Sequence, residues 1–150
     1  AGLGRDAYVL ADLGCSVTLI ERSTVLALML DQALERASIS AIASVQLAAS
    51  RMQLQPGDSR DYKTSEETVI YLDPMFTDRR GSAAVKKDLS VLQALHGSVD
   101  NEDEPLLAWA LEQPVRRVVV KRPMKSLPLG HRKPSHGIKG KAVRFDVYVL

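Results

Sequence analysis

Two short stretches of the sequence combine residue types that can hold a ligand. The first, Gly2-Leu3-Gly4, lies at the start of the chain, and the second, Asp73-Pro74-Met75-Phe76, follows an apolar run. Glycine lets the backbone approach a cofactor closely, because a side chain there would collide with it. The Asp-Pro tip offers a carboxylate and a carbonyl as acceptors for an amine, and the aromatic ring offers a surface for stacking. Together the two stretches suggest a methyl donor and a nucleobase as ligands.

An acid at the end of a predicted strand also indicates a nucleotide-like cofactor. Glu21 follows the apolar run 17–20 and lies 17 positions beyond Gly4. In doubly wound folds such an acid accepts hydrogen bonds from ribose hydroxyls, in dinucleotide and S-adenosylmethionine sites alike. Residues 2–7 also satisfy the loose pattern G-x-G-x-x-A, so a nicotinamide oxidoreductase remains an alternative. The other interpretation of Glu21 is a surface acid at a strand end.

A second acid follows the next predicted strand. Asp58 comes directly after Pro56-Gly57, which breaks that strand. In a methyltransferase this is a usual place for a residue that contacts the adenine. The alternative is an aspartate that only holds a tight turn.

The tip at Asp73 favours methylation of an exocyclic amine over hydride transfer. The lone pair of such an amine is delocalised into the base, which makes it a poor nucleophile. The Asp73 carboxylate and the Pro74 carbonyl would hold the amino hydrogens and orient the lone pair towards the donor methyl. Stacking of the base on Phe76 would contribute ~1–3 kcal/mol. The alternative is a β-turn after a strand, with Phe76 in the core.

The elements that must position these residues alternate along the chain. Apolar, β-branched runs predict strands at 17–20, 52–54, 68–72, 115–121 and 142–149. Spacing and caps predict helices at 6–13, after Ser23, at 39–49, at 82–96 and at 105–113. This alternation predicts a doubly wound α/β fold with a mostly parallel sheet and right-handed crossovers. Residues 124–140 show no helical pattern, so the last strand is expected to pair antiparallel.

Two predictions concern the core. The helix after Ser23 is expected to bury the face formed by Leu26, Met29, Leu30, Ala33 and Leu34. Trp109 is expected in the core beneath the helix at 105–113. With 45% hydrophobic and only 5% aromatic residues, the core must be mostly aliphatic, as suits a sheet covered by helices.

Length and composition indicate one domain of a cytoplasmic protein. The chain has 150 residues and a single cysteine, Cys15, which excludes an internal disulfide and fits a reducing compartment. No apolar run approaches the ~20 residues of a membrane helix, so no membrane partner is expected. The glycine turn opens the chain, although such a turn should follow a buried strand. We therefore expect a fragment of a longer protein, whose missing part supplies the first central strand.

The net charge of +2 is unevenly distributed. Residues 114–150 contain ten Lys and Arg against one acid, Asp146, and so carry +9. The rest of the chain must then carry −7. A basic block on a near-neutral protein predicts a nucleic-acid partner, because such binding depends chiefly on neutralised phosphates. The alternative is a solvated basic surface.

Five motifs, in order, resemble the bacterial small-subunit ribosomal RNA guanine methyltransferases that modify the 2-amino group. These motifs are Ala1-Gly2-Leu3-Gly4-Arg5-Asp6-Ala7, Tyr71-Leu72-Asp73-Pro74-Met75-Phe76, Ser82-Ala83-Ala84-Val85-Lys86-Lys87, Arg117-Val118-Val119-Val120-Lys121-Arg122-Pro123 and Arg144-Phe145-Asp146-Val147-Tyr148. The resemblance covers nearly the whole chain. It implies a class I fold that uses S-adenosylmethionine as cofactor and acts on the small ribosomal subunit or its RNA. Thr77-Asp78 departs from the proline often found after the aromatic in this family.

The predicted site residues follow from the residues and the resemblance together. The predicted catalytic residues are Asp73, Pro74 and Phe76. The predicted cofactor-binding residues are Gly2, Gly4, Arg5, Asp6, Glu21, Arg22, Asp58 and Asp73. The predicted RNA-binding residues are Lys86, Lys87, Lys121 and Arg122. The alternative is that their charged ends are only solvated, while their aliphatic stems cover apolar surface.

Neither metal nor covalent chemistry is predicted. The three histidines, His96, His131 and His136, have no metal-ligand spacing, and one cysteine does not make a zinc site. Cys15 is expected to be a packed small residue rather than a nucleophile. A non-catalytic RNA-binding module that keeps the fold is the remaining alternative.

Overall fold

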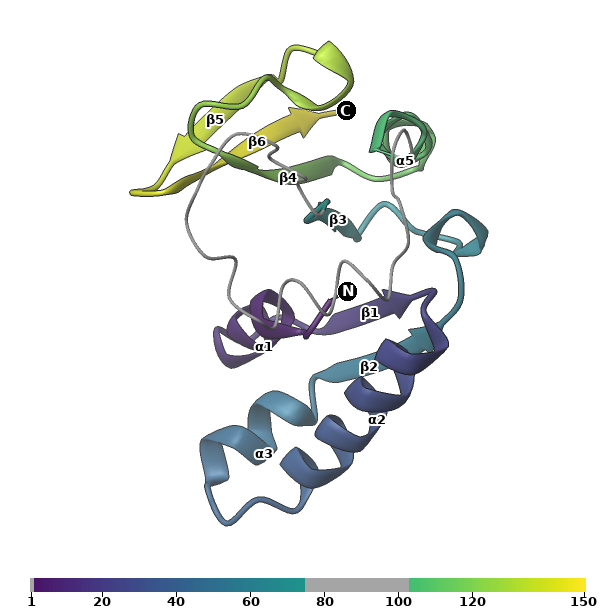
Figure 1. Ribbon diagram of the computed structural model, residues 1–150, viewed down its shortest axis with the longest axis vertical. Helices are drawn as coiled ribbons and strands as arrows, with labels where there is room; N and C mark the ends of the chain where they lie inside the picture. Colours follow the sequence, from purple (N-terminus) through teal and green to yellow (C-terminus); the bar gives the residue numbers. More distant parts are fainter. Residues whose placement is uncertain (1, 75–102) are drawn as a thin grey trace. The chain divides into compact units, whose positions relative to one another are not determined.

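A computed structural model of the chain describes residues 2–74 and 103–150, which form two compact units. Among the described residues, the first unit contains 2–61 and the second contains 62–74 and 103–150. Figure 1 shows the elements of each unit, which we treat separately. Four predictions lie outside the described residues, namely the helix at 82–96, Phe76, Lys86 and Lys87.

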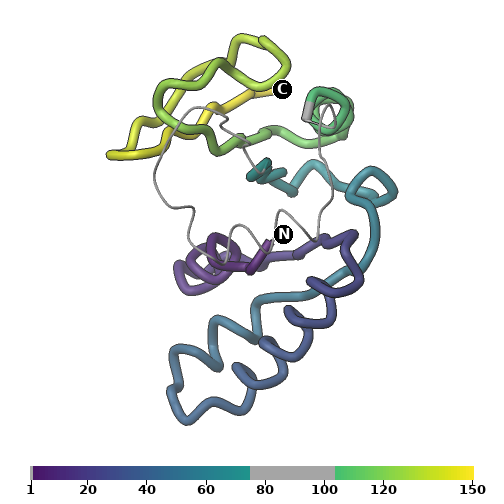
Figure 2. The backbone as a smooth tube through the Cα atoms, in the orientation of Figure 1, coloured from purple at the N-terminus to yellow at the C-terminus, as the bar shows by residue number. Residues whose placement is uncertain are grey.

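The first unit is a pair of parallel strands with three helices. Its elements are α1 (Arg5–Asp12), β1 (Val17–Glu21), α2 (Thr24–Ser38), α3 (Ala43–Ala49), β2 (Met52–Pro56) and a short 3-10 helix, η1 (Ser59–Asp61). The strands pair in parallel from Val17 beside Met52 to Glu21 beside Pro56. Figure 2 shows how the chain leaves β1, passes through α2 and α3, and returns along β2. The predicted strand-helix alternation is confirmed here.

Local residue choices set the boundaries of these helices. Gly4 precedes α1 with a φ of 70°, and Gly14 follows it with a φ of 103°, a left-handed backbone that favours glycine. The Ser23 side chain accepts a hydrogen bond from the Leu26 N–H and caps α2, as predicted. The buried stripe of α2 is narrower than expected. It consists of Leu26, Ala27 and Leu30, whereas Met29 and Ala33 are exposed.

The second unit is built on a four-stranded sheet. Its elements are β3 (Val69–Leu72), α5 (Asp103–Glu112), β4 (Arg117–Pro123), a short 3-10 helix, η2 (Leu129–His131), β5 (His136–Lys139) and β6 (Val143–Val149). The strand order is β3-β4-β6-β5. β3 and β4 are parallel, while β6 pairs antiparallel with both β4 and β5. The antiparallel last strand is therefore confirmed.

Strand β5 was not predicted from the sequence. Residues 124–140 were expected to be a connection without regular structure, but His136–Lys139 pairs with β6 as an edge strand. All four of its residues are exposed, so it lacks the apolar alternation that marks a strand in sequence. Its stability comes from the ladder with β6, which a local pattern does not reveal.

One face of this sheet carries the core of the second unit. Alternate residues of the strands are buried together with residues of α5 and η2, and this cluster consists of Ile70, Leu72, Leu107, Ala110, Val115, Val118, Val120, Leu129 and Tyr148. Trp109 is only partly buried and packs against the cluster from α5. Within the described residues, no helix combines the length and apolar character needed to cross a membrane.

Candidate functional site

The glycine turn at the start of α1 uses its two glycines differently. A Cβ atom on Gly4 would lie 3.0 Å from the Leu30 side chain and 3.4 Å from that of Leu19, so this glycine permits close packing. A Cβ atom on Gly2 would meet nothing within 4 Å. The space beside Gly2 is therefore open, and a role of this glycine in cofactor binding stays a prediction. Arg5 and Asp6 follow in the first turn of α1, the former exposed and the latter half-buried.

Glu21 is buried beside this turn, with a relative exposure of 2%. Its Oε2 accepts a hydrogen bond from the Gly2 N–H at 3.2 Å, and its Oε1 accepts one from the Ser23 N–H at 2.8 Å. Its backbone carbonyl accepts a third from the Gly57 N–H at 2.9 Å. The interpretation of Glu21 as a surface acid is therefore wrong. The residue joins the glycine turn, the start of α2 and the end of β2.

Asp58 holds a turn at the end of β2. Its Oδ1 accepts hydrogen bonds from the backbone N–H and the Nε of Arg60, both at 2.9 Å, and its Oδ2 accepts one from Arg60 Nη2 at 2.6 Å. These bonds lower the pKa of Asp58 to about 2, to which the nearby Arg22 charge also contributes. The turn-holding interpretation is confirmed, and contact with an adenine stays a prediction.

Asp73 lies one residue beyond β3, as expected for an acid at a strand tip. Its side chain is 44% exposed, and its Oδ2 lies 3.0 Å from the Nζ of Lys121 in the neighbouring strand β4. Pro74 beside it is buried. The structure thus pairs a predicted catalytic residue with a predicted RNA-binding residue, which sequence reasoning did not anticipate.

Arg122, the next residue of β4, differs from its predicted role. It is buried, with an exposure of 8%, and its Nε and Nη2 donate to the Leu127 carbonyl at 3.1 and 2.7 Å. Its guanidinium therefore fixes the turn that follows β4. The expectation of a solvated or phosphate-facing side chain at this position is corrected, because the alternation of β4 directs Arg122 to the buried face.

A second arginine organises the same turn. Arg144 Nη1 donates to the carbonyls of Pro123, Met124 and Ser126, at 3.1, 3.0 and 2.7 Å. Its Nε and Nη2 bind the two carboxylate oxygens of Asp146, which is 2% exposed. This bidentate ion pair raises the pKa of Arg144. The guanidinium of Arg144 therefore links Asp146 of β6 to the turn that follows β4.

Three exposed lysines lie in or next to the hairpin of β5 and β6. Lys133, Lys139 and Lys141 are all exposed along this edge of the sheet. The only acid of residues 114–150, Asp146, is buried on Arg144, so it does not offset these charges at the surface. We refer to Lys133, Lys139 and Lys141 as the basic edge.

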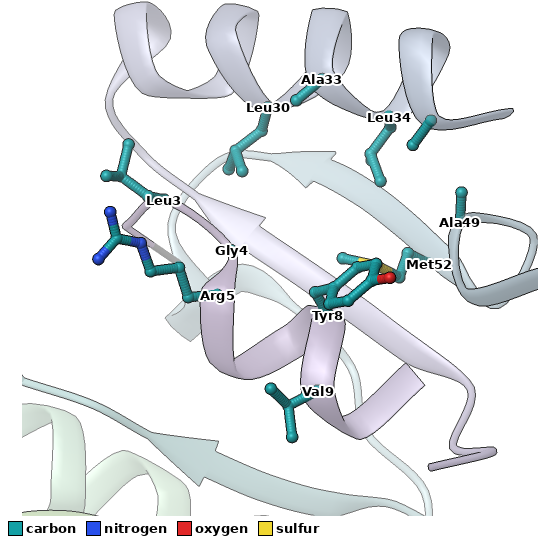
Figure 3. A pocket seen from close by; sticks show the side chains of 11 residues that line it. Leu3, Gly4, Arg5, Tyr8, Val9, Leu30, Ala33, Leu34, Ala49 and Met52 are labelled. Atoms are coloured by element: carbon teal, nitrogen blue, oxygen red, sulfur yellow. The ribbon is translucent and has the colours of Figure 1, made fainter. Parts of the chain in front are cut away.

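A pocket of about 440 Å³ lies beside the glycine turn within the first unit. Figure 3 shows Leu30 and Leu34 extending from α2 towards Tyr8 of α1 and Met52 of β2. The residues that line the pocket are almost all apolar, and none of them is a carboxylate. It therefore offers no carboxylate to ribose hydroxyls, and Glu21 is not among the residues that line it.

Cys15 is exposed just after α1, so the expectation that it is a packed small residue is wrong. It follows Gly14 in the turn between α1 and β1, where the chain has left the core.

Comparison with known proteins identifies the family. Residues 1–150 match a protein family described as "Putative SAM-dependent methyltransferase". "Ribosomal RNA small subunit methyltransferase J" of Thioalkalivibrio sulfidiphilus is 51% identical, over 99% of this chain and 59% of its own length. The protein of the same name from Colwellia psychrerythraea is 48% identical, over 99% of this chain and 54% of its own length. The chain thus spans somewhat more than half the length of these relatives.

Solved structures agree on the fold. A SAM-dependent methyltransferase from Neisseria gonorrhoeae superimposes with a TM-score of 0.74 at 33% identity, covering 99% of this chain and 62% of that one. A glycopeptide N-methyltransferase solved with S-adenosyl-L-methionine superimposes with a TM-score of 0.51 at 19% identity. The match covers 99% of this chain and 57% of that one, and it supports the fold alone. The chain belongs to the SAM-dependent methyltransferase family and has its class I α/β fold.

Proposed function

We propose that the full-length protein transfers a methyl group from S-adenosylmethionine to the exocyclic 2-amino group of a guanine in small-subunit ribosomal RNA. The observation that carries this proposal is the match, over 99% of this chain, to relatives named for small-subunit ribosomal RNA methylation, at 51% and 48% identity. The chemistry of the Asp73 tip, an acid exposed at the end of a parallel strand, supports an amine as the acceptor.

The first unit supplies the residues proposed to hold the cofactor. Gly2 leaves space beside the turn, and the Glu21 carboxylate, which accepts from the Gly2 N–H, would also accept hydrogen bonds from ribose hydroxyls. Asp58, ionised at any pH above about 3 because its pKa is about 2, would accept from the adenine amine. The remaining proposed cofactor-binding residues are Arg5 and Asp6, which follow the glycine turn, and Arg22, which follows Glu21. When bound, the cofactor supplies an electrophilic methyl group.

The second unit supplies the residues proposed to hold the base. The Asp73 carboxylate and the Pro74 carbonyl would accept the two amino hydrogens of the guanine, which turns the nitrogen lone pair towards the donor. Asp73 would also face the cofactor. Phe76 is proposed to stack on the base. A base in paired RNA would first have to leave its stack. Catalysis then depends on positioning and electrostatics, without a covalent intermediate.

The basic edge is the proposed docking surface for the RNA backbone. Its three lysines are exposed, and no acid of residues 114–150 lies at the surface to oppose them. Lys86 and Lys87 are proposed as further phosphate contacts on the basis of the sequence alone. Arg122 is assigned a different role, since its guanidinium binds the Leu127 carbonyl and would support this surface from behind.

Purified full-length protein can test the proposal directly. It is incubated with methyl-labelled S-adenosylmethionine and either naked small-subunit RNA or assembled small subunits, and the RNA is digested to nucleosides. Label in N2-methylguanosine is the expected result. Label in another nucleoside would contradict the proposed acceptor, while RNA binding without transfer on either substrate would favour a non-catalytic RNA-binding module. Protection from unfolding by a nicotinamide cofactor rather than S-adenosylmethionine would favour an oxidoreductase.

A further inference from the structure

Lys121 projects from a strand of the second unit that is paired on both sides. β4 is paired on both sides, in parallel with β3 and antiparallel with β6, and Lys121 lies opposite Phe145 in the β6 ladder. The last ladder pair between β3 and β4 joins Leu72 to Val120. Asp73 therefore stands one residue beyond the β3 ladder, while Lys121 stands one residue further along a strand that continues to Pro123.

The two side chains lie on the same face of the sheet. Leu72 and Val120 are buried in the core face, so Lys121 in β4 points to the opposite face, and so does Asp73 just past the end of β3. On that face the Lys121 Nζ reaches Asp73 Oδ2 at 3.0 Å. The Tyr71 and Phe145 rings, with centroids 6.4 Å apart, belong to the same face by the alternation of their strands. Lys121 is thus placed between Asp73 on one neighbouring strand and Phe145 on the other.

We propose that Lys121 is a positioning residue for methyl transfer, which orients the Asp73 carboxylate towards the acceptor amine. This inference rests on the proposed function and assigns Lys121 a role other than binding RNA phosphate. Asp73 is 44% exposed and lies past the end of its strand, where a carboxylate has rotational freedom that a catalytic acceptor must lose. Lys121 is only 25% exposed and comes from a strand held on both sides, so it provides a fixed anchor.

The ion pair has a consequence for catalysis rather than for folding. A pair that is exposed to this degree adds little to stability. The hydrogen bond from Lys121 Nζ to Asp73 Oδ2 restricts rotation of the carboxylate, which favours one orientation of its other oxygen as an acceptor. Since amine methylation depends on aligning a poor nucleophile, loss of this alignment lowers the rate of the chemical step. Affinity for RNA and for the cofactor is not expected to change.

The test compares Lys121→Met and Lys121→Arg with the wild type in the full-length protein. Met keeps much of the length of the lysine stem but has no charge, and Arg keeps the cation. Lys63→Met, at an exposed lysine outside the predicted site, controls for the loss of one positive charge. Three quantities are measured for each variant, namely the single-turnover rate at saturating RNA and cofactor, the Kd for S-adenosylmethionine, and the Kd for RNA at several salt concentrations.

Lys121→Met is expected to lower the single-turnover rate about 10- to 100-fold, with both Kd values within about twofold of the wild type. Lys121→Arg should recover most of the rate, and Lys63→Met should match the wild type. A normal rate at saturation in Lys121→Met, with weaker RNA binding and a salt slope reduced by about 0.7–0.9, would overturn the inference and make Lys121 a phosphate contact. An Arg variant as slow as the Met variant, with the fold and cofactor affinity intact, would also overturn it. Failure of the wild type to methylate RNA would instead refute the proposed function, and this inference with it.

Discussion

The carboxylate of Glu21 accepts a hydrogen bond from the backbone N–H of Gly2, with 3.2 Å between Oε2 and N, across 19 residues of sequence. Its other oxygen accepts from the N–H of Ser23 at 2.8 Å. One buried side chain therefore sets the position of the glycine turn relative to the start of α2. A residue placed in this way can both shape a cofactor site and line it.

Replacement of Glu21 tests this double role. Glu21→Ala removes a charged acceptor, and we expect S-adenosylmethionine binding to weaken by roughly 1–3 kcal/mol. Isothermal titration calorimetry on the full-length protein measures the change. Glu35→Ala, at an exposed acid on α2, serves as the control and should leave affinity unchanged. Equal affinity in the two variants would remove Glu21 from the cofactor site and leave it a structural role only.

Removing one partner of the Arg144–Asp146 ion pair is expected to destabilise the second unit strongly. Arg144→Met leaves the buried Asp146 carboxylate without its bidentate partner and frees three carbonyls of the turn after β4. Breaking a buried pair from one side costs about 3–5 kcal/mol. Urea denaturation of the full-length protein, with the exposed Arg116→Met as control, measures the difference. If Arg144→Met lowers the free energy of unfolding no more than Arg116→Met does, the turn after β4 is stable without the Arg144 contacts.

The low pKa of Asp58 is expected to depend on Arg60. The folded-state pKa of about 2 lies below the ordinary 3.8, so the ion pair stabilises the folded protein above pH 3.8 and this contribution is lost as the pH falls towards 2. Arg60→Met removes the side-chain hydrogen bonds, which are the largest cause of the shift, and the pKa should rise towards 3.8. An NMR titration of the Asp58 carboxyl carbon follows this change. A pKa that remains near 2 would assign the shift to the backbone N–H of residue 60 or to Arg22.

The sequence was most informative where a local pattern and a cap coincide. Ser23 and the apolar residues after it predicted α2, and the turn after Pro56 predicted the end of β2. Prediction from the sequence failed where pairing with a distant strand decides the structure. β5 carries His136, Gly137 and Lys139, none of which favours a strand alone, and it forms because β6 offers a ladder.

For the candidate site residues, too, the sequence predicted positions along the chain but not the contacts that the tertiary fold creates. The strand-end positions of Glu21 and Asp73 could be predicted, because each ends an apolar run. The partners of their carboxylates could not, since Gly2 and Lys121 are brought to them by the fold. The burial of Arg122 could not be predicted either, because nothing in the sequence shows that the chain turns back to place the Leu127 carbonyl against its guanidinium.

The basic edge is expected to carry much of the salt dependence of RNA binding. Replacing Lys133, Lys139 and Lys141 with Ala should weaken RNA binding, and each lost phosphate contact should reduce the slope of log K against log salt by about 0.7–0.9. S-adenosylmethionine affinity should stay the same. Fluorescence anisotropy at several salt concentrations, with Lys63→Ala as control, gives the slopes. Parallel slopes for the triple variant and the wild type would mean that RNA docks elsewhere.

Asp73 is proposed to orient a guanine amine of small-subunit ribosomal RNA for methylation. Nucleoside mass spectrometry of this RNA, from cells that lack the gene and carry either the wild-type gene or Asp73→Ala, tests it most directly. Removing a positioned electrostatic partner should slow transfer by ~10²-fold or more. We predict that one N2-methylguanosine is lost on deletion, returns with the wild-type gene and stays absent with Asp73→Ala, although the variant protein accumulates normally. Full restoration by Asp73→Ala, or an unchanged N2-methylguanosine content after deletion, would contradict the account.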